Sequence, residues 1–178
     1  MSLYERVPAS YVEKLLVPAR VAMPGPEHVA GAFALSVNSP YRPGPESLLE
    51  LLNTPARVVP FMRTGDDTVL LLARLSIDWV EVEHRVDPTW VRPESVVAAR
   101  EEQVQVRLLD GRRIEGLVAM DLPEHLNRIS DFLNLPEDFF ALRTRSSIVI
   151  VNKSRISGAR LFESSPRPPA DLGGSGPR

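Results

Sequence analysis

An internal repeat sets the strongest limit on how this chain of 178 residues can fold. The motif Leu-Leu-Asn-Thr-Pro at residues 51–55 recurs as Phe-Leu-Asn-Leu-Pro at residues 132–136. Each motif is followed by an apolar cluster and then by a strand-like run, residues 69–72 in the first copy and 148–151 in the second. Because similarity repeated in a fixed order marks repeated structural units, we interpret the chain as two copies of one unit of about 70–80 residues.

The spacing of apolar residues in the second copy indicates its strands and its helix. Apolar and polar residues alternate over its first strand, as is typical of a half-buried strand, and Asp110-Gly111 indicates a hairpin turn. Ile129, Phe132 and Leu133 follow the helical spacing i, i+3, i+4 and predict a short amphipathic helix. The expected strands of this copy are residues 104–108, 113–120, 139–144, 148–151 and 157–162.

Short strands joined by tight turns favour a mainly β (β-rich α+β) fold. We expect two small barrels or rolls of the SH3-like or Sm-like type, each with one short helix. Small barrels bury little surface alone, so the copies should pack on each other or on a partner, with Trp79 at a strand end or between them. The expected organisation is a first copy over 1–86, a linker over 87–103, a second copy over 104–163 and a disordered tail over 164–178.

The composition argues against several classes of function. The chain has no cysteine, which excludes a disulfide scaffold, a thiol nucleophile and a zinc site with cysteine ligands. Its three histidines stand in unrelated contexts, so we expect no metal and no cofactor. No phosphate-binding loop, dinucleotide fingerprint or serine-nucleophile motif occurs in the sequence, which makes an enzyme the weakest class. No apolar run approaches the ~20 residues of a membrane helix, and we expect a cytoplasmic protein.

One charge feature stands out although the net charge is only −2. The stretch 139–162 contains five basic residues and no acidic one. Arg143 and Arg145 are expected to project from one face of a strand, and Lys153 and Arg155 from its neighbour. This pattern has two readings: a basic surface for phosphate or an acidic partner, or a solvated face whose acids come from elsewhere in the fold.

Two segments of the second copy carry a resemblance to a known family. Residues 104–116, with the sequence VQVRLLDGRRIEG, resemble the first motif of Sm-like proteins, and the likeness continues into Asp121 and Asn127. Residues 150–156, with the sequence IVNKSRI, are similar to the second motif of that family. The resemblance implies a small barrel, and it places Asn127 and Lys153 where that family binds RNA.

A second pattern runs through the same part of the chain. Asp-Gly-Arg, then Arg-x-Ser-Asp-Phe-Leu-Asn, then Val-Asn-Lys-x-x-Ile, all within residues 104–156, resembles bacterial proteins of uncharacterised activity. This resemblance implies a bacterial setting and carries no activity across.

The leading functional hypothesis is a non-catalytic protein-binding adaptor or assembly subunit. It would bind another protein or itself through sheet edges or through the helix face that contains Phe132. One alternative is a nucleic-acid-binding module that uses Arg143, Arg145, Lys153 and Arg155. A second alternative is a sensor of a small phosphorylated ligand that uses the same side chains.

Overall fold

The computed structural model describes residues 13–25, 27–66, 68–93, 100–120, 122 and 128–162, and the architecture below concerns these residues. The first half contains, in chain order, β1 (Lys14–Ala22), β2 (His28–Ser36), α1 (Leu48–Leu52), β3 (Val58–Arg63), β4 (Val69–Ala73), the 3-10 helix η1 (Arg74–Ser76) and β5 (Trp79–Glu83). A short helix follows, α2 (Pro88–Val91). The second half contains β6 (Arg100–Leu108), β7 (Arg113–Met120), α3 (Ile129–Leu133), β8 (Phe139–Arg143), β9 (Ser147–Asn152), the 3-10 helix η3 (Lys153–Arg155) and β10 (Ile156–Leu161).

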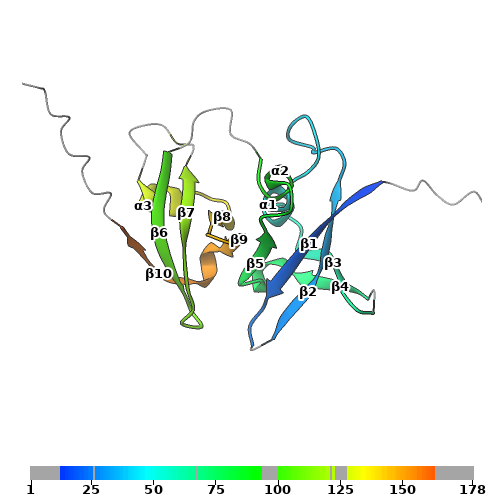
Figure 1. Cartoon of the computed structure of the whole chain (residues 1–178), viewed down its shortest axis with the longest axis horizontal. Coiled ribbons are helices and arrows are strands. Elements are labelled where there is room, and N and C mark those ends of the chain that lie inside the picture. The colour runs from blue at the N-terminus through cyan, green and yellow to red at the C-terminus, as the bar shows by residue number, and fades with distance from the viewer. Residues whose placement is uncertain are drawn as a thin grey trace, which may run out of the picture.

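The strands form one open antiparallel sheet in the order β10-β6-β7-β8-β9-β5-β1-β2-β3-β4. Each half keeps its own five strands together in this sheet, and the halves meet where β9 pairs with β5 (Figure 1). The mainly β fold predicted from the sequence is confirmed. The two copies were expected to be separate barrels that pack on each other, whereas the structure joins the halves by backbone hydrogen bonds into one sheet.

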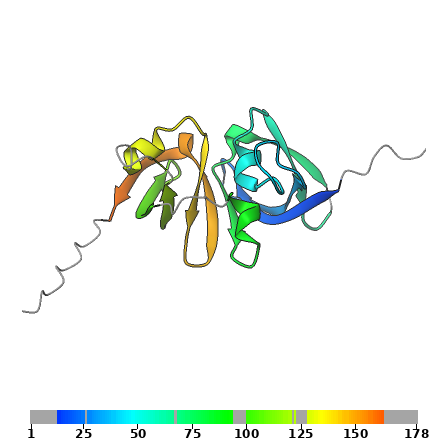
Figure 2. The ribbon, with the colours of Figure 1, turned by 90° about the horizontal axis from the view of Figure 1, so that it is seen from above.

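Two apolar cores lie on either side of this junction, one in each lobe of the molecule (Figure 2). Side chains of β9 alternate between them, because successive residues of a strand point to opposite faces of the sheet. Ile148 and Ile150 enter the core of the first half, and Val149 and Val151 enter the core of the second. Trp79 was expected at a strand end or between the copies; it is the first residue of β5 and is buried in the core of the second half.

The second-half elements lie close to their expected positions. Gly111 has φ = +87°, the left-handed conformation that the Asp110-Gly111 turn requires. The boundary between the halves differs from the expectation, because the strand predicted from Val104 begins at Arg100 and α2 lies inside the expected linker. Residues 94–99 and the expected tail over 164–178 lie outside the described residues. None of the described helices has the length and apolar character needed to span a membrane.

Two glycines allow neighbouring strands of each half to approach closely. A Cβ atom on Gly31 of β2 would overlap with the Met62 carbonyl oxygen, and one on Gly116 of β7 would make a longer contact of 2.8 Å with the Arg143 carbonyl oxygen. Backbone atoms cannot move aside as the end of a flexible side chain can, so both positions require glycine. The two glycines hold the same place in the element order of their halves.

We therefore expect Gly31→Ala to lower the free energy of unfolding by about 2 kcal/mol or more, because an added methyl group has no space against β3. Gly116→Ala should destabilise less, since its contact is longer. Urea unfolding followed by circular dichroism measures both changes. Gly158→Ala in β10 is the matched control, because a methyl group added there would have nothing within 4 Å of it. Equal stability of all three variants would contradict this account.

Candidate functional site

The sheet ends in two strands, β4 and β10, and within the described residues no further strand pairs with either outer edge. An edge of this kind presents unpaired backbone N–H and C=O groups that pair readily with another chain. The β10 edge lies at the left end of the molecule and the β4 edge at the right end in Figure 1. These two edges form the candidate functional site.

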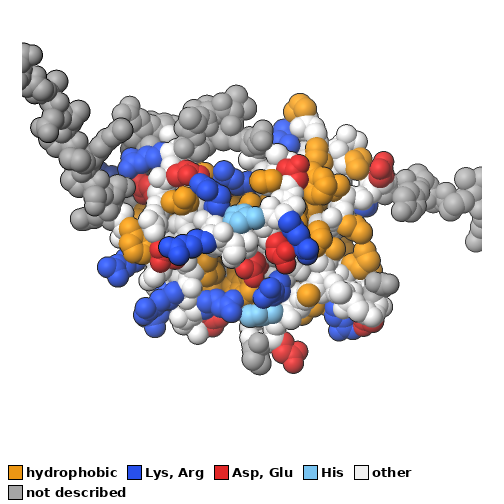
Figure 3. All heavy atoms as spheres, viewed as in Figure 1, with side chains coloured by type: hydrophobic (Ala, Val, Ile, Leu, Met, Phe, Trp, Pro, Cys, Tyr) orange, Lys and Arg blue, Asp and Glu red, His pale blue; other side chains and the backbone are white. Residues whose placement is uncertain are grey.

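The β4 edge is flanked by an exposed apolar surface, which we call the β3–β4 apolar face. Val69 is 61% exposed and Leu71 is 69% exposed, whereas the alternate residues Val59, Phe61 and Leu72 point into the core. Hydrophobic side chains gather at this end of the molecule in the space-filling view (Figure 3). The face consists of the cross-strand pairs Val58–Ala73, Pro60–Leu71 and Met62–Val69.

In the second half, the third and fourth strands, β8 and β9, form the hairpin that corresponds to β3–β4. The face of this hairpin that corresponds to the β3–β4 apolar face is covered. On that face Ile148 is 5% exposed and Ile150 is 0% exposed, and both pack with Phe139 in the core of the first half. The β8–β9 hairpin therefore buries this face against the first half, whereas the β3–β4 hairpin presents the corresponding face to solvent.

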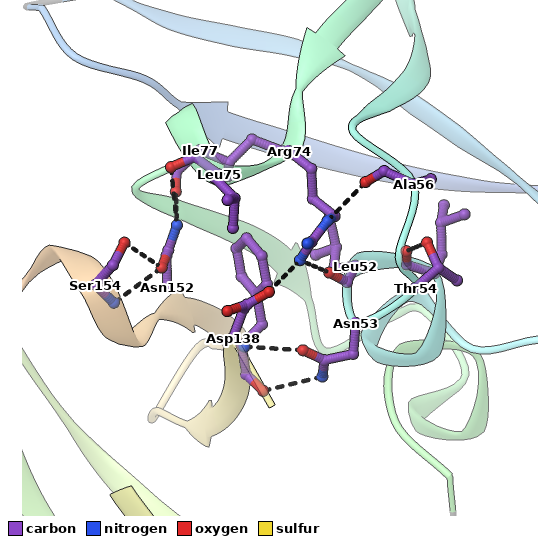
Figure 4. A network of polar contacts seen from close by, with 12 residues as sticks. Leu52, Asn53, Thr54, Ala56, Arg74, Leu75, Ile77, Asp138, Asn152 and Ser154 are labelled. Atoms are coloured by element: carbon purple, nitrogen blue, oxygen red, sulfur yellow. Dashed lines mark hydrogen bonds and ion pairs between the residues drawn. The ribbon is translucent and has the colours of Figure 1, made fainter. Parts of the chain in front are cut away.

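Polar contacts fix the covered hairpin in place (Figure 4). Asn53 ends helix α1, and its side-chain Nδ2 donates a hydrogen bond of 3.0 Å to the carbonyl oxygen of Phe139. Its Oδ1 accepts a hydrogen bond of 2.9 Å from the backbone N–H of the same residue. The amide thus pairs with the backbone at the start of β8, much as a neighbouring strand would.

Arg74 of η1 is the buried cation of this junction. Its guanidinium donates hydrogen bonds of 2.9 Å to the carbonyl oxygens of Leu52 and Ala56, and a third bond of 2.7 Å to Asp138 Oδ2 (Figure 4). On the other side of β9, Asn152 Nδ2 donates to the carbonyl oxygen of Ile77 at 2.9 Å. These contacts satisfy buried polar groups and join the two halves through side chains as well as through strand pairing.

Of the residues singled out from the sequence, Phe132 and Lys153 lie together. Phe132 is half-buried, and its ring packs edge-on against Phe140 at a centroid distance of 5.7 Å. Lys153 Nζ lies 5.5 Å from the Phe132 ring centroid and donates to the carbonyl oxygens of Phe132 and Leu135 at 3.2 and 3.0 Å. Burial lowers the pKa of Lys153, although the negative charges of Glu137 and Asp138 act to raise it. This ammonium group therefore caps the end of α3.

The arginines are mostly paired with acids from elsewhere in the fold. Arg143 Nη2 lies 2.7 Å from both carboxylate oxygens of Glu101 in β6. Arg155 Nε lies 3.1 Å from Asp78 Oδ1, which precedes β5. Arg145 is exposed in the turn between β8 and β9.

The expectation that Lys153 and Arg155 project from the strand beside that of Arg143 and Arg145 is wrong, because both lie in the 3-10 helix η3. Arg143 and Arg145 lie at the turn that precedes β9, whereas Lys153 and Arg155 lie in η3 at its far end. Six residues of strand separate the two pairs, a length of roughly 20 Å. The alternation of side chains along β9 does not continue through Lys153 and Arg155, because the chain enters a tight helical turn directly after Asn152. Asn127 lies outside the described residues.

The residues that join the halves were not singled out from the sequence. The repeated Leu-Asn-x-Pro motif marks Asn53 and Asn134 as equivalent helix ends, but no local pattern shows what either side chain contacts. The apolar run over residues 69–73 predicts a strand, but it does not show that Val69 and Leu71 are exposed. No group of three potential metal-ligating side chains occurs among the residues that the structure describes.

Comparisons with models of protein families, with curated proteins and with solved structures return no match.

We expect Asn53→Ala to lower the free energy of unfolding by about 1–3 kcal/mol, because it leaves the backbone groups of Phe139 without partners at the junction. Asn134→Ala is the matched control, since Asn134 ends α3 and is exposed. The control should change stability by no more than about 0.5 kcal/mol. Chemical unfolding at a low protein concentration measures both variants, and equal effects would contradict the assigned role of Asn53.

Proposed function

We propose that this chain is a non-catalytic protein-binding adaptor or assembly subunit of a bacterial cytoplasm. The observation that carries the proposal is the β3–β4 apolar face beside the β4 edge, with which no further strand of the described residues pairs. A partner strand added to such an edge gains backbone hydrogen bonds and at the same time covers apolar side chains. Contiguous exposed apolar surface of this kind is typical of interaction sites on soluble proteins.

We further infer that the halves are copies of one small SH3-like or Sm-like unit, each with one helix between its second and third strands. The element order ββα followed by ββ, a 3-10 helix and β occurs in both halves, and it supports this inference. Each half also arranges its strands in the order fifth, first, second, third, fourth. A meander whose last strand returns to its first is consistent with a small rolled sheet. The closely approached Gly31 and Gly116 are further support.

A binding role without catalysis is consistent with how the polar groups are used. The buried polar side chains Ser47, Arg74 and Asn152 cap helices and join the halves. In the described part of the chain these three side chains stabilise the fold.

A variant of the β3–β4 apolar face tests the proposal. Leu71→Lys should weaken partner binding at least tenfold, because it places a charge where an apolar surface is to be buried. Quantitative affinity capture from the lysate of the source organism, with purified wild-type and variant chains as baits, measures the loss. Leu109→Lys is the control, since Leu109 is also largely exposed but lies in the β6–β7 turn. Equal retention of every protein by the wild type and both variants, or no retained protein at all, would contradict the proposal.

The nucleic-acid alternative makes a different prediction. Because Arg143 and Arg155 are paired with acids and Lys153 caps α3, we expect no tight binding of RNA or DNA with a steep dependence on salt. Fluorescence anisotropy with labelled oligonucleotides at low and high salt measures this. Salt-sensitive binding that is lost in the double variant Arg143→Glu, Arg145→Glu would favour the alternative. A thermal shift with nucleotides would likewise favour a phosphorylated ligand.

A further inference from the structure

We propose that the partner of each free edge is a second copy of this chain. The β4 edge of one copy pairs with the β10 edge of the next, in the register that β9 and β5 adopt within the chain. This inference rests on the proposed binding function and on the inferred duplication, and it names the partner that the two edges fit.

The junction between the halves is the template. β9 is the fourth strand of its half and β5 is the fifth strand of the other, and they pair antiparallel from Trp79–Val151 to Glu83–Ser147. The strands left at the two ends of the sheet are β4, again a fourth strand, and β10, again a fifth strand. Among the described residues, a fourth strand thus pairs with a fifth strand once, and one further strand of each type keeps a free edge.

The equivalence of the halves gives the register between copies. Ile77 and Ile156 directly follow the two 3-10 helices and are 79 residues apart, and the same spacing relates β4 to β9 and β5 to β10. The internal pair Val80–Ile150 therefore corresponds to Ala159–Leu71 between copies. The internal pair Val82–Ile148 corresponds to Leu161–Val69 between copies.

Burial supports this pairing. Ile148 and Ile150 are covered by the first half, whereas the corresponding Val69 and Leu71 are exposed. On the opposite strand, Leu161 is 50% exposed. A second copy docked in this register places Leu161 beside Val69 and covers the β3–β4 apolar face, which gives these side chains the apolar surroundings that their counterparts already have.

A polar contact repeats as well. Within the chain, the amide of Asn53 at the end of α1 pairs with the backbone of Phe139, the first residue of β8. Asn134 ends α3 in the same way and is exposed, and Val58 is the first residue of β3. Between copies, Asn134 is therefore placed to pair with the backbone of Val58.

One contact differs, and it sets the strength of the association. Arg74 and Asp138 form an ion pair at the internal junction, and their counterparts are Lys153 and Arg57, which have like charge. Like charges brought together at an interface weaken it. The junction between copies is therefore weaker than the internal one, and Arg57→Asp should strengthen it by restoring an ion pair.

The resulting assembly joins unlike surfaces. Because the β4 and β10 edges lie at opposite ends of the sheet, one copy can use both edges at once (Figure 1). Unlike surfaces joined head to tail form a ring where the rotation closes and an open filament where it does not.

Sedimentation velocity of the purified full-length chain over a wide concentration range tests self-association. We expect oligomers whose amount rises with concentration, a loss of these oligomers in Leu71→Lys, and no change in Leu109→Lys. Arg57→Asp should tighten the association roughly tenfold. A chain that stays monomeric at all concentrations, in the wild type and in Arg57→Asp, would overturn the inference.

Cysteine trapping tests the register, and the natural absence of cysteine makes each introduced thiol unique. A mixture of the single variants Val69→Cys and Leu161→Cys should form a disulfide-linked heterodimer under mild oxidation, since directly opposite residues of antiparallel strands have Cα atoms close enough for a disulfide. A mixture of Leu70→Cys and Leu161→Cys is the control, because neighbouring residues of a strand point to opposite faces. Equal yields in the two mixtures would overturn the proposed register.

These results separate the inference from the proposed function. Specific capture of a different protein that is lost in Leu71→Lys, together with a monomeric chain, would sustain the binding function and overturn self-association. A monomeric chain that captures nothing through this face would overturn both.

Discussion

The pairing of β9 with β5 sets the positions of both halves of the molecule. It turns two five-stranded halves into one sheet and places β9 between them, with every residue of this strand buried. Since its side chains alternate between two cores, one strand stabilises both lobes. Small β units bury too little apolar surface to be very stable alone, so a shared strand offsets the small size of each half.

The polar groups at this junction follow from the strand pairing. Once β9 lies against β5, the start of β8 and the end of α1 come together, and their backbone groups are withdrawn from water. Asn53 and Arg74 supply the hydrogen bonds that these groups then need. The same need explains Lys153 of the second half, which satisfies carbonyl oxygens at the end of α3. The positive charge of Lys153, which belongs to a candidate binding surface in the sequence, thus has a structural use.

The joined halves are alike in topology and unlike in exposure. A linear chain of two units with one fourth-to-fifth strand junction necessarily leaves one fourth strand and one fifth strand without that junction. The exposed Val69 and Leu71 are therefore a consequence of the architecture, as are the buried Ile148 and Ile150. Val69 and Leu71 are apolar at positions where a solvated strand would tolerate polar residues. Exposed apolar side chains that lie together in this way are typical of interaction surfaces.

Features that depend on neighbouring residues could be predicted from the sequence alone. The two-residue period of its strands, the Asp110-Gly111 turn and the short helix at Ile129–Leu133 follow from local backbone preferences, and all are found in the structure. Which hairpin is covered, where the four cations lie and what Asn53 contacts became clear only from the packing of the folded chain. Asn53 and Phe139 are 86 residues apart, and a contact at that distance depends on how the two halves pack, which no local pattern contains.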